Sequence, residues 1–255
     1  MPPFDKASLR REWQIFLLAL GFLSRIPVPQ DPDFSPEKLD GAARYFPLVG
    51  LLIGGVTAIA LLVFFALFNN PLLAVLLSMA VGLLLTGAFH EDGLADSADG
   101  FGGGWRRDDV LRIMKDSRIG SYGTAALFMV LAIKAASLSA MPIAQAVGGI
   151  LIAQVVSRWL AISFLIDMPY VSGEGKSKPL ATALSLRDWL LAGLPVLLLL
   201  GFAQASQWLL LLLILGGFRL GFGRYLSRRI QGYTGDALGA AQQLSEILIY
   251  LVILL

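Results

Sequence analysis

The stretch "HEDGLADSADG", residues 90–100, carries the densest set of groups able to do chemistry. It follows a long apolar run ending in "VGLLLTGAF" and holds four carboxylates, those of Glu91, Asp92, Asp96 and Asp99. The aspartates are spaced i, i+4 and i+7, which places all three on one face of a helix. Like charges in that arrangement destabilise a helix unless a cation binds between them.

The sequence restricts which cation this could be. Cysteine is absent and His90 is the single histidine, so thiolate chemistry and a poly-histidine metal centre are excluded. Carboxylates suit Mg²⁺, which takes one or two of them and bridges to phosphate oxygens of a substrate. The alternative is a solvated acidic helix end, where carboxylates merely suit the helix dipole. Three aspartates in phase at a membrane edge favour the metal site.

A basic segment, "GFGGGWRRDDVLRIMKDSRIGSYG" at 100–123, follows at once. Within it, "RRDDVLRIMKD" predicts a short amphipathic helix, and Arg112, Lys115 and Arg118 suit the binding of phosphate. Asp116 could supply a further carboxylate. The alternative reading is topology alone, because lysine and arginine accumulate on cytoplasmic loops in any case. Acids and bases in one loop nevertheless indicate a site for a metal-bound diphosphate.

The end of this segment predicts the start of another helix. Gly120 and Gly123 lead into the next apolar run, and Ser121 or Thr124 is the expected cap. Backbone N–H groups at such a helix start bind phosphate well.

A second polar constellation lies near the end of the chain. Asp236, Gln243 and Glu246 are spaced i, i+7 and i+10 and form one stripe on the last apolar run. An acid inside a membrane is functional by default and should face the interior of a helix bundle. A structural ion pair of Glu246 with Lys134 or Arg158 is the alternative.

These residues must be positioned by membrane helices. The chain has 255 residues, of which 56% are hydrophobic and 15% charged, and its mean hydropathy is +0.73. Apolar runs near ~20 residues match the thickness of a bilayer, so we predict an all-α polytopic integral membrane bundle forming a single domain, 1–255. The expected spans are 46–68, 71–89, 124–140, 143–166, 188–203, 206–220 and 237–255.

The apolar run 13–23 is too short to span and predicts an interfacial or re-entrant helix. A cleaved signal peptide is the alternative, but Ser24-Arg25 is a poor cleavage site. Eighteen of the twenty lysines and arginines fall in the stretches 1–45, 90–123, 167–187 and 219–236. The positive-inside rule therefore predicts that these stretches, and the active site, face the cytoplasm.

Two motifs give a resemblance to a known family. "FHEDGLADSADGFGGG" and "IMKDSRIGSYG" resemble the signature of cobalamin synthases, which are adenosylcobinamide-GDP ribazoletransferases. "FLSRIPVP", "RYFPLVGLLIG" and "GYTGDALGA" extend the resemblance over roughly residues 22–246. One departure is Gln231, where the family pattern has the first glycine of a pair.

The resemblance implies a reaction and a location. Adenosylcobinamide-GDP and α-ribazole, or α-ribazole 5′-phosphate, would be the substrates, GMP the leaving group and Mg²⁺ the cofactor. The protein would lie in the bacterial cytoplasmic (inner) membrane with the lipid bilayer around it. No nucleic acid is implied as a partner, and a homo-oligomer is compatible with the sequence.

On this reading each candidate residue has an expected role. The candidate metal ligands are Glu91, Asp92, Asp96 and Asp99. The candidate catalytic bases are Asp99 and Asp116. The candidate substrate-binding residues are His90, Arg112, Lys115, Arg118, Asp236, Gln243 and Glu246.

Other classes fit the sequence less well. A transporter would carry polar residues near the midplane and often repeat symmetry, whereas the polar groups here gather at the ends of spans. A purely structural subunit does not explain the in-phase aspartates. The closest competing enzyme is a CDP-alcohol phosphotransferase, whose motif needs an arginine where Asp96 follows Ala95.

Overall fold

The computed structural model describes residues 6–31, 35–171 and 183–255, and within these ranges it contains helices and no strand. The predicted all-α fold is confirmed. Part of the predicted polar stretch 167–187 lies outside the described residues.

The described residues form thirteen α-helices. They are α1 Lys6–Leu23, α2 Pro36–Ala42, α3 Phe46–Phe68, α4 Pro71–Thr86, α5 Phe89–Gly103, α6 Arg107–Met114, α7 Ser121–Ala140, α8 Ile143–Ile162, α9 Phe164–Asp167, α10 Leu186–Ala192, α11 Leu194–Leu197, α12 Ala205–Arg229 and α13 Gly235–Leu254. Two 3₁₀ turns, Ala43–Tyr45 and Leu200–Phe202, precede α3 and α12.

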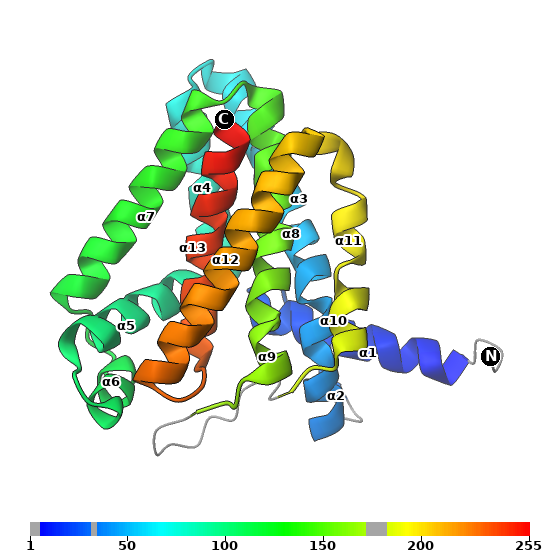
Figure 1. The fold of residues 1–255 in the computed structure, drawn as a ribbon. Coiled ribbons are helices and arrows are strands. Elements are labelled where there is room, and N and C mark those ends of the chain that lie inside the picture. The colour runs from blue at the N-terminus through cyan, green and yellow to red at the C-terminus, as the bar shows by residue number, and fades with distance from the viewer. Residues whose placement is uncertain (1–5, 32–34, 172–182) are drawn as a thin grey trace.

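Five stretches of the described chain are long and apolar enough to cross a membrane, and they contain α3, α7, α8 with α9, α12 and α13. Helices α4 and α5 pass the same test only as a pair bent by 88°. We treat α4 as the crossing, because α5 turns away across the end of the bundle (Figure 1). The polytopic membrane fold predicted from the apolar runs is therefore confirmed.

The predicted span 188–203 is not one continuous helix. It is divided into α10, α11 and a 3₁₀ turn, with the first break at Gly193. Pro195 lacks a backbone N–H, and its ring would clash with the carbonyl group one turn earlier in a regular helix. A proline inside a helix therefore kinks or breaks it. The segment still runs from the α1 end of the bundle to the opposite end (Figure 1).

Helix α1 lies across one end of the bundle, which also carries α2, α5 and α6; we call this the polar end (Figure 1). It begins earlier than the predicted run 13–23, and its inner face buries Ile15, Phe16, Ala19 and Leu20 beneath α2 and α3. This face packs on the protein, as the apolar face of an amphipathic helix does, and the interfacial or re-entrant position of α1 stays a prediction.

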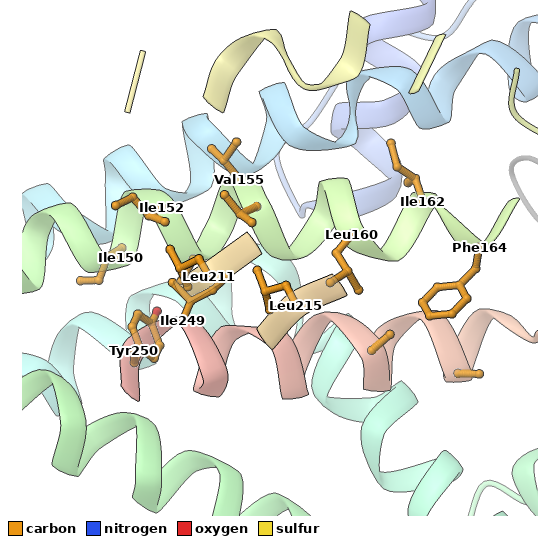
Figure 2. Close-up of a cluster of buried hydrophobic side chains, with 14 of the residues drawn as sticks. Ile150, Ile152, Val155, Leu160, Ile162, Phe164, Leu211, Leu215, Ile249 and Tyr250 are labelled. Atoms are coloured by element: carbon orange, nitrogen blue, oxygen red, sulfur yellow. The ribbon is translucent and has the colours of Figure 1, made fainter. Parts of the chain in front are cut away.

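Helices α8 and α13 form the centre of the bundle. About three quarters of each is buried (78% for the α8 stretch and 72% for α13), against 22% for the α12 stretch. Ile150 and Ile152 of α8 pack with Ile249 and Tyr250 of α13 in this core (Figure 2). The outer helices therefore present leucine-rich faces to lipid while the central pair can hold polar groups.

The turn between α4 and α5 orients the acidic helix. Gly87 and Ala88 both adopt left-handed backbone conformations, with φ of 65° and 56°. Glycine reaches this region freely, whereas alanine does so at a cost of roughly 1–2 kcal/mol. The two residues bend the chain so that α5 lies across the polar end.

Candidate active site

The three in-phase aspartates lie on α5, and their burial increases along the helix. Asp92 is exposed, Asp96 is half-buried and Asp99 is buried. The two oxygens of Asp99 accept the backbone N–H groups of Gly120 at 2.7 Å and Gly123 at 2.9 Å. Asp99 therefore caps the start of α7 from another helix.

This contact corrects one prediction. Neither Ser121 nor Thr124 caps α7: its N-cap residue is Gly120, and the Thr124 hydroxyl donates back to the Gly120 carbonyl at 2.8 Å. A carboxylate relieves the unpaired N–H groups better than a neutral hydroxyl, because it also suits the helix dipole. The phosphate site expected at this helix start is thus filled by Asp99.

The last helix meets α5 through glycines. A Cβ atom on Gly93 would lie 3.0 Å from the Asp236 Cα, and one on Gly239 would lie 3.3 Å from the Gly93 Cα. Such spacing leaves no room for a side chain at either glycine. Because the backbones approach so closely, Asp236 in the first turn of α13 lies beside the acidic face of α5.

The charges confirm that these acids share one environment. Burial first, and then the negative charges of Asp236, Asp92 and Asp99, raise the pKa of Asp96 to about 7. A carboxylate beside other carboxylates resists losing its proton, and a bound cation would reverse that effect. We call Asp92, Asp96 and Asp236 the acidic cluster.

The acidic cluster fits Mg²⁺ by its donor chemistry. Among the described residues, no three His, Cys, Asp or Glu side chains are close enough to form a ready-made metal cage. Mg²⁺ seldom needs one, because it uses one or two carboxylates and completes its shell with water and substrate phosphate. Carboxylates that repel one another at the polar end provide such a partial shell.

Glu91 does not face the acidic cluster. It is one residue before Asp92, about 100° further around the helix, and its Oε1 accepts the Gln243 amide at 2.8 Å. Glu91 therefore belongs to the network in the interior of the bundle, together with Gln243 and Glu246.

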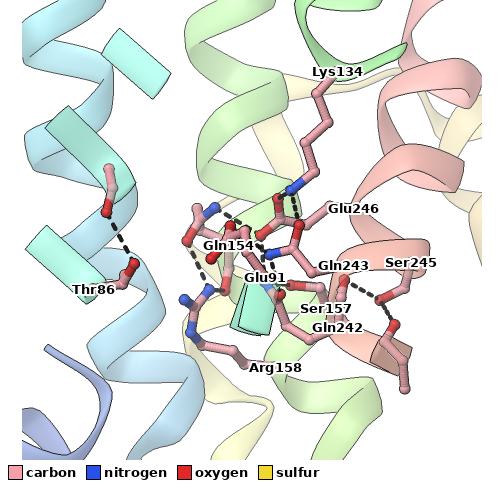
Figure 3. A network of polar contacts seen from close by, with 12 residues as sticks. Thr86, Glu91, Lys134, Gln154, Ser157, Arg158, Gln242, Gln243, Ser245 and Glu246 are labelled. Atoms are coloured by element: carbon pink, nitrogen blue, oxygen red, sulfur yellow. Dashed lines mark hydrogen bonds and ion pairs between the residues drawn. The ribbon is translucent and has the colours of Figure 1, made fainter. Parts of the chain in front are cut away.

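The second predicted constellation is divided: Asp236 lies in the acidic cluster, whereas Gln243 and Glu246 belong to this interior network, which centres on an ion pair (Figure 3). Lys134 of α7 donates to Glu246 at 2.5 Å and also to Gln243. The other Glu246 oxygen accepts the amides of Gln154, at 2.7 Å, and Gln242. Glu246 therefore forms with Lys134 the structural ion pair that the sequence analysis gave as the alternative to a functional role.

Arg158, the other expected partner, lies at the edge of this network. Its Nη1 donates to the carbonyl and side-chain oxygens of Gln154. A cavity of about 60 Å³ adjoins these residues and His90. The Glu91 Oε2 and the Arg158 Nε are buried without a hydrogen-bond partner among the described residues. Such atoms next to a polar cavity are suited to ordered water.

The predicted amphipathic helix is confirmed as α6, which buries Val110, Leu111 and Met114. Its basic residues remain at the surface: Arg112 pairs with Asp109 at 3.2 Å, and Lys115 is near enough to influence the charge of Asp236.

Asp116 pairs with a neighbour in sequence. Arg118 binds its carboxylate at 2.8 Å, and this hydrogen bond is the main reason why the pKa of Asp116 falls to about 2. A carboxylate with so low a pKa is a weak base.

Two arginines that the sequence analysis did not single out hold the basic segment in place. Arg229, at the end of α12, donates to the carbonyls of Gly104 at 2.6 Å and Phe101 at 3.1 Å. Arg107 donates to the Ile230 carbonyl at 3.0 Å. No local sequence pattern predicts these hydrogen bonds, because they join segments more than a hundred residues apart.

The comparisons with known proteins identify the family. A family profile described as cobalamin-5-phosphate synthase matches residues 15–254, which include the acidic cluster and the interior network. The chain belongs to this family.

Curated relatives of the family are similar over nearly their whole length. An adenosylcobinamide-GDP ribazoletransferase of Ralstonia nicotianae is 46% identical over 255 residues, covering 97% of both chains. Relatives with the same name from Vibrio parahaemolyticus and Shewanella putrefaciens are 46% and 44% identical, covering 98% of this chain and 95% and 97% of theirs. No solved structure matches the chain.

Membership in the cobalamin-5-phosphate synthase family makes this protein a transferase of cobalamin synthesis. It argues against the CDP-alcohol phosphotransferase alternative, as does Asp96 at the position where that motif needs arginine.

Proposed function

We propose that the protein is a Mg²⁺-dependent transferase that joins α-ribazole, or α-ribazole 5′-phosphate, to adenosylcobinamide-GDP and releases GMP. The observation that carries this proposal is the meeting of Asp236 with Asp92 and Asp96 beside the basic segment. Acids for a metal and bases for phosphate oxygens at one place suit a diphosphate substrate. The names of the relatives supply the identity of that substrate.

In the proposed reaction, an oxygen of the ribose hydroxyl attacks the phosphorus that carries cobinamide. The bond from that phosphorus to the bridging oxygen breaks, GMP leaves with the bridging oxygen, and the hydroxyl proton is released. The new phosphodiester joins the ribazole to the corrinoid. Phosphoryl transfer of this kind depends mainly on positioning and on neutralising charge.

One or two carboxylates of the acidic cluster (Asp92, Asp96 and Asp236) would bind Mg²⁺ directly, and the cluster's remaining carboxylate would contact it through a water ligand. When bound, the metal would neutralise charge on the diphosphate oxygens. Lys115 is close enough to Asp236 to influence its charge and would bind a phosphate oxygen. Arg112 lies on α6, which ends just before Lys115. Both side chains are exposed, so a substrate in the aqueous phase can reach them.

Of the two predicted bases, Asp99 is favoured. Arg118 keeps the pKa of Asp116 at about 2, which weakens Asp116 as a proton acceptor. Asp99 accepts two backbone N–H bonds, yet a carboxylate has about four acceptor positions in all. Gly120 and Gly123 would then fix the base on the α5 face that bears Asp96.

We further propose that the polar end faces the cytoplasm in the bacterial inner membrane. Eighteen of the twenty lysines and arginines lie in the stretches assigned to that end, and their distribution supports this orientation. The substrates, which are large and charged, would reach the acidic cluster directly from the aqueous side.

The test is GMP release by the protein in nanodiscs, given adenosylcobinamide-GDP and α-ribazole with and without Mg²⁺. We expect release that needs both substrates and the metal, and we expect Asp96→Asn to abolish it. Asp108→Asn is the matched control, because Asp108 is an exposed aspartate of α6 that pairs only at 3.5 Å with Arg107. Near-normal release by Asp96→Asn would reject the assignment of Asp96.

A further inference from the structure

A large cavity lies away from the acidic cluster. It has a volume of about 540 Å³ and is an open groove lined by α8, α9, α10, α11 and α12. Helix α12 passes in front of α8, and α11 runs beside it (Figure 1). None of the residues assigned to the transferase reaction lines this groove.

Three tryptophans give the groove apolar walls. Trp159 and Trp189 stack with ring centroids 4.6 Å apart, and each indole N–H donates to the other's carbonyl, at 2.8 and 3.0 Å. The Trp208 indole donates to the Leu200 carbonyl at 3.1 Å. Since all three donors bind protein carbonyls, the rings offer the groove only apolar surface.

One end of the groove is charged. Apart from the tryptophans, its polar lining residues are Ser163, Asp167 and Arg219. Arg219 lies over the Phe164 ring, donates to Ser163 at 2.8 Å and pairs with Asp167. The Asp167 side chain remains 60% exposed. The mouth thus presents a positive and a negative group side by side.

The dimensions suit one lipid chain. From Trp208 to Arg219, α12 rises about 16 Å, which is about half of the ~30 Å hydrocarbon core. One acyl chain, which reaches from a headgroup to the middle of the hydrocarbon core, has a comparable length. Leu212, on the same stretch of α12, is 71% exposed, so the groove adjoins a face of the bundle that must contact lipid. A nucleotide or an amide-rich corrinoid would find too few polar partners along these walls.

We propose that this groove binds one acyl chain of phosphatidylethanolamine, with the phosphate at Arg219 and the ammonium group at Asp167. The chain fills the apolar groove and the zwitterionic headgroup matches the charge pair at its mouth. Because the groove shares no residue with the acidic cluster, the proposal is independent of the transferase mechanism.

Two neighbouring glycines provide the test. A Cβ atom on either Gly216 or Gly217 would meet no atom within 4 Å, but only Gly216 lines the groove. Gly216→Trp should therefore fill the groove while Gly217→Trp leaves it open. Native mass spectrometry of protein released from nanodiscs of phosphatidylethanolamine and phosphatidylglycerol measures the bound lipid.

We expect the wild type and Gly217→Trp to retain one phosphatidylethanolamine per chain, and Gly216→Trp to lose at least four fifths of it. Equal retention by the two variants, or no retained lipid in the wild type, would overturn the site. Preferential retention of phosphatidylglycerol by the wild type would overturn the headgroup assignment. Asp167→Asn should remove the preference between the two lipids without emptying the groove.

Discussion

Gly93 of α5 and Asp236 of α13 are in such close contact that a Cβ atom on Gly93 would lie 3.0 Å from the Asp236 Cα. This contact joins the two acidic stretches of the sequence into one cluster. Residues separated by 140 positions or more thereby form the proposed metal site, and its geometry depends on a glycine that does no chemistry itself.

Gly93→Ala tests this dependence. The added methyl group must push α13 away from α5, and overpacking of this kind costs about 1–3 kcal/mol of stability. The contact at 3.0 Å requires a shift of a few tenths of an ångström, and a 1 Å misplacement at a reacting centre costs about a hundredfold in rate. We expect GMP release to fall clearly, but by less than about a hundredfold. Gly55→Ala is the control, because a Cβ atom on Gly55 of α3 would meet no atom within 4 Å; equal activity of the two variants would contradict the role of the contact.

The two candidate bases can be separated by paired substitutions. Asp99→Asn should lower kcat by at least about a hundredfold, because it removes the base and one of the two N–H acceptors at α7. Asp116→Asn should lower kcat less than about threefold, since the Asp116–Arg118 pair is at the surface and the carboxylate is a weak base. A larger loss in Asp116→Asn than in Asp99→Asn would reverse the assignment.

The acidic cluster predicts how stability depends on pH. The pKa of Asp96 rises from 3.8 to about 7 in the folded protein, so the folded state holds a proton that the unfolded state releases. Between these values stability therefore falls as pH rises, and Mg²⁺ should restore it at high pH.

Thermal unfolding in EDTA at pH 5 and pH 8, repeated with Mg²⁺, measures this effect. We expect the unfolding temperature without metal to be lower at pH 8, and the difference to shrink in Asp96→Asn. If the metal-free protein is instead more stable at pH 8 than at pH 5, the acidic cluster does not raise the pKa of Asp96 in the folded state.

Removing one charge from the interior network should strongly destabilise the folded protein. Lys134→Met leaves the Glu246 carboxylate buried without its cation, which costs about 3–5 kcal/mol. Adding Glu246→Gln should recover at least half of the loss, because Gln154 and Gln242 can still donate to the new amide oxygen. Unfolding temperatures of the single and double variants measure the coupling; additive losses would mean that the pair is not a unit.

The sequence predicts where the helices lie along the chain better than it predicts which helices pack against one another. The apolar runs at 46–68 and 143–166 become α3 and α8 with α9 almost residue for residue, since length and hydropathy decide a crossing. The division of 188–203 was missed, although Pro195 was visible in the sequence. Gln231 adopts φ of 61°, the left-handed region that the family's glycine would enter freely.

The sequence indicates which residues belong to the candidate site, but it does not indicate the directions in which their side chains point. The helical phase of Asp92, Asp96 and Asp99 is right, but helical phase alone does not tell which side of α5 faces the interior. Glu91 therefore turned out to join the interior network, and Asp99 to cap α7. The approach of Asp236 rests on the glycine contact between α5 and α13, which no local pattern contains.

The most direct test of the acidic cluster is a Mg²⁺ titration of GMP release by wild type, Asp236→Asn and Asp108→Asn in nanodiscs. Because Asp236 would hold the metal with Asp92 and Asp96, its loss should raise the Mg²⁺ concentration for half activation by at least about tenfold. Asp108→Asn should leave that concentration unchanged. An unaltered Mg²⁺ requirement in folded Asp236→Asn, or release by wild type without any divalent metal, would contradict the account.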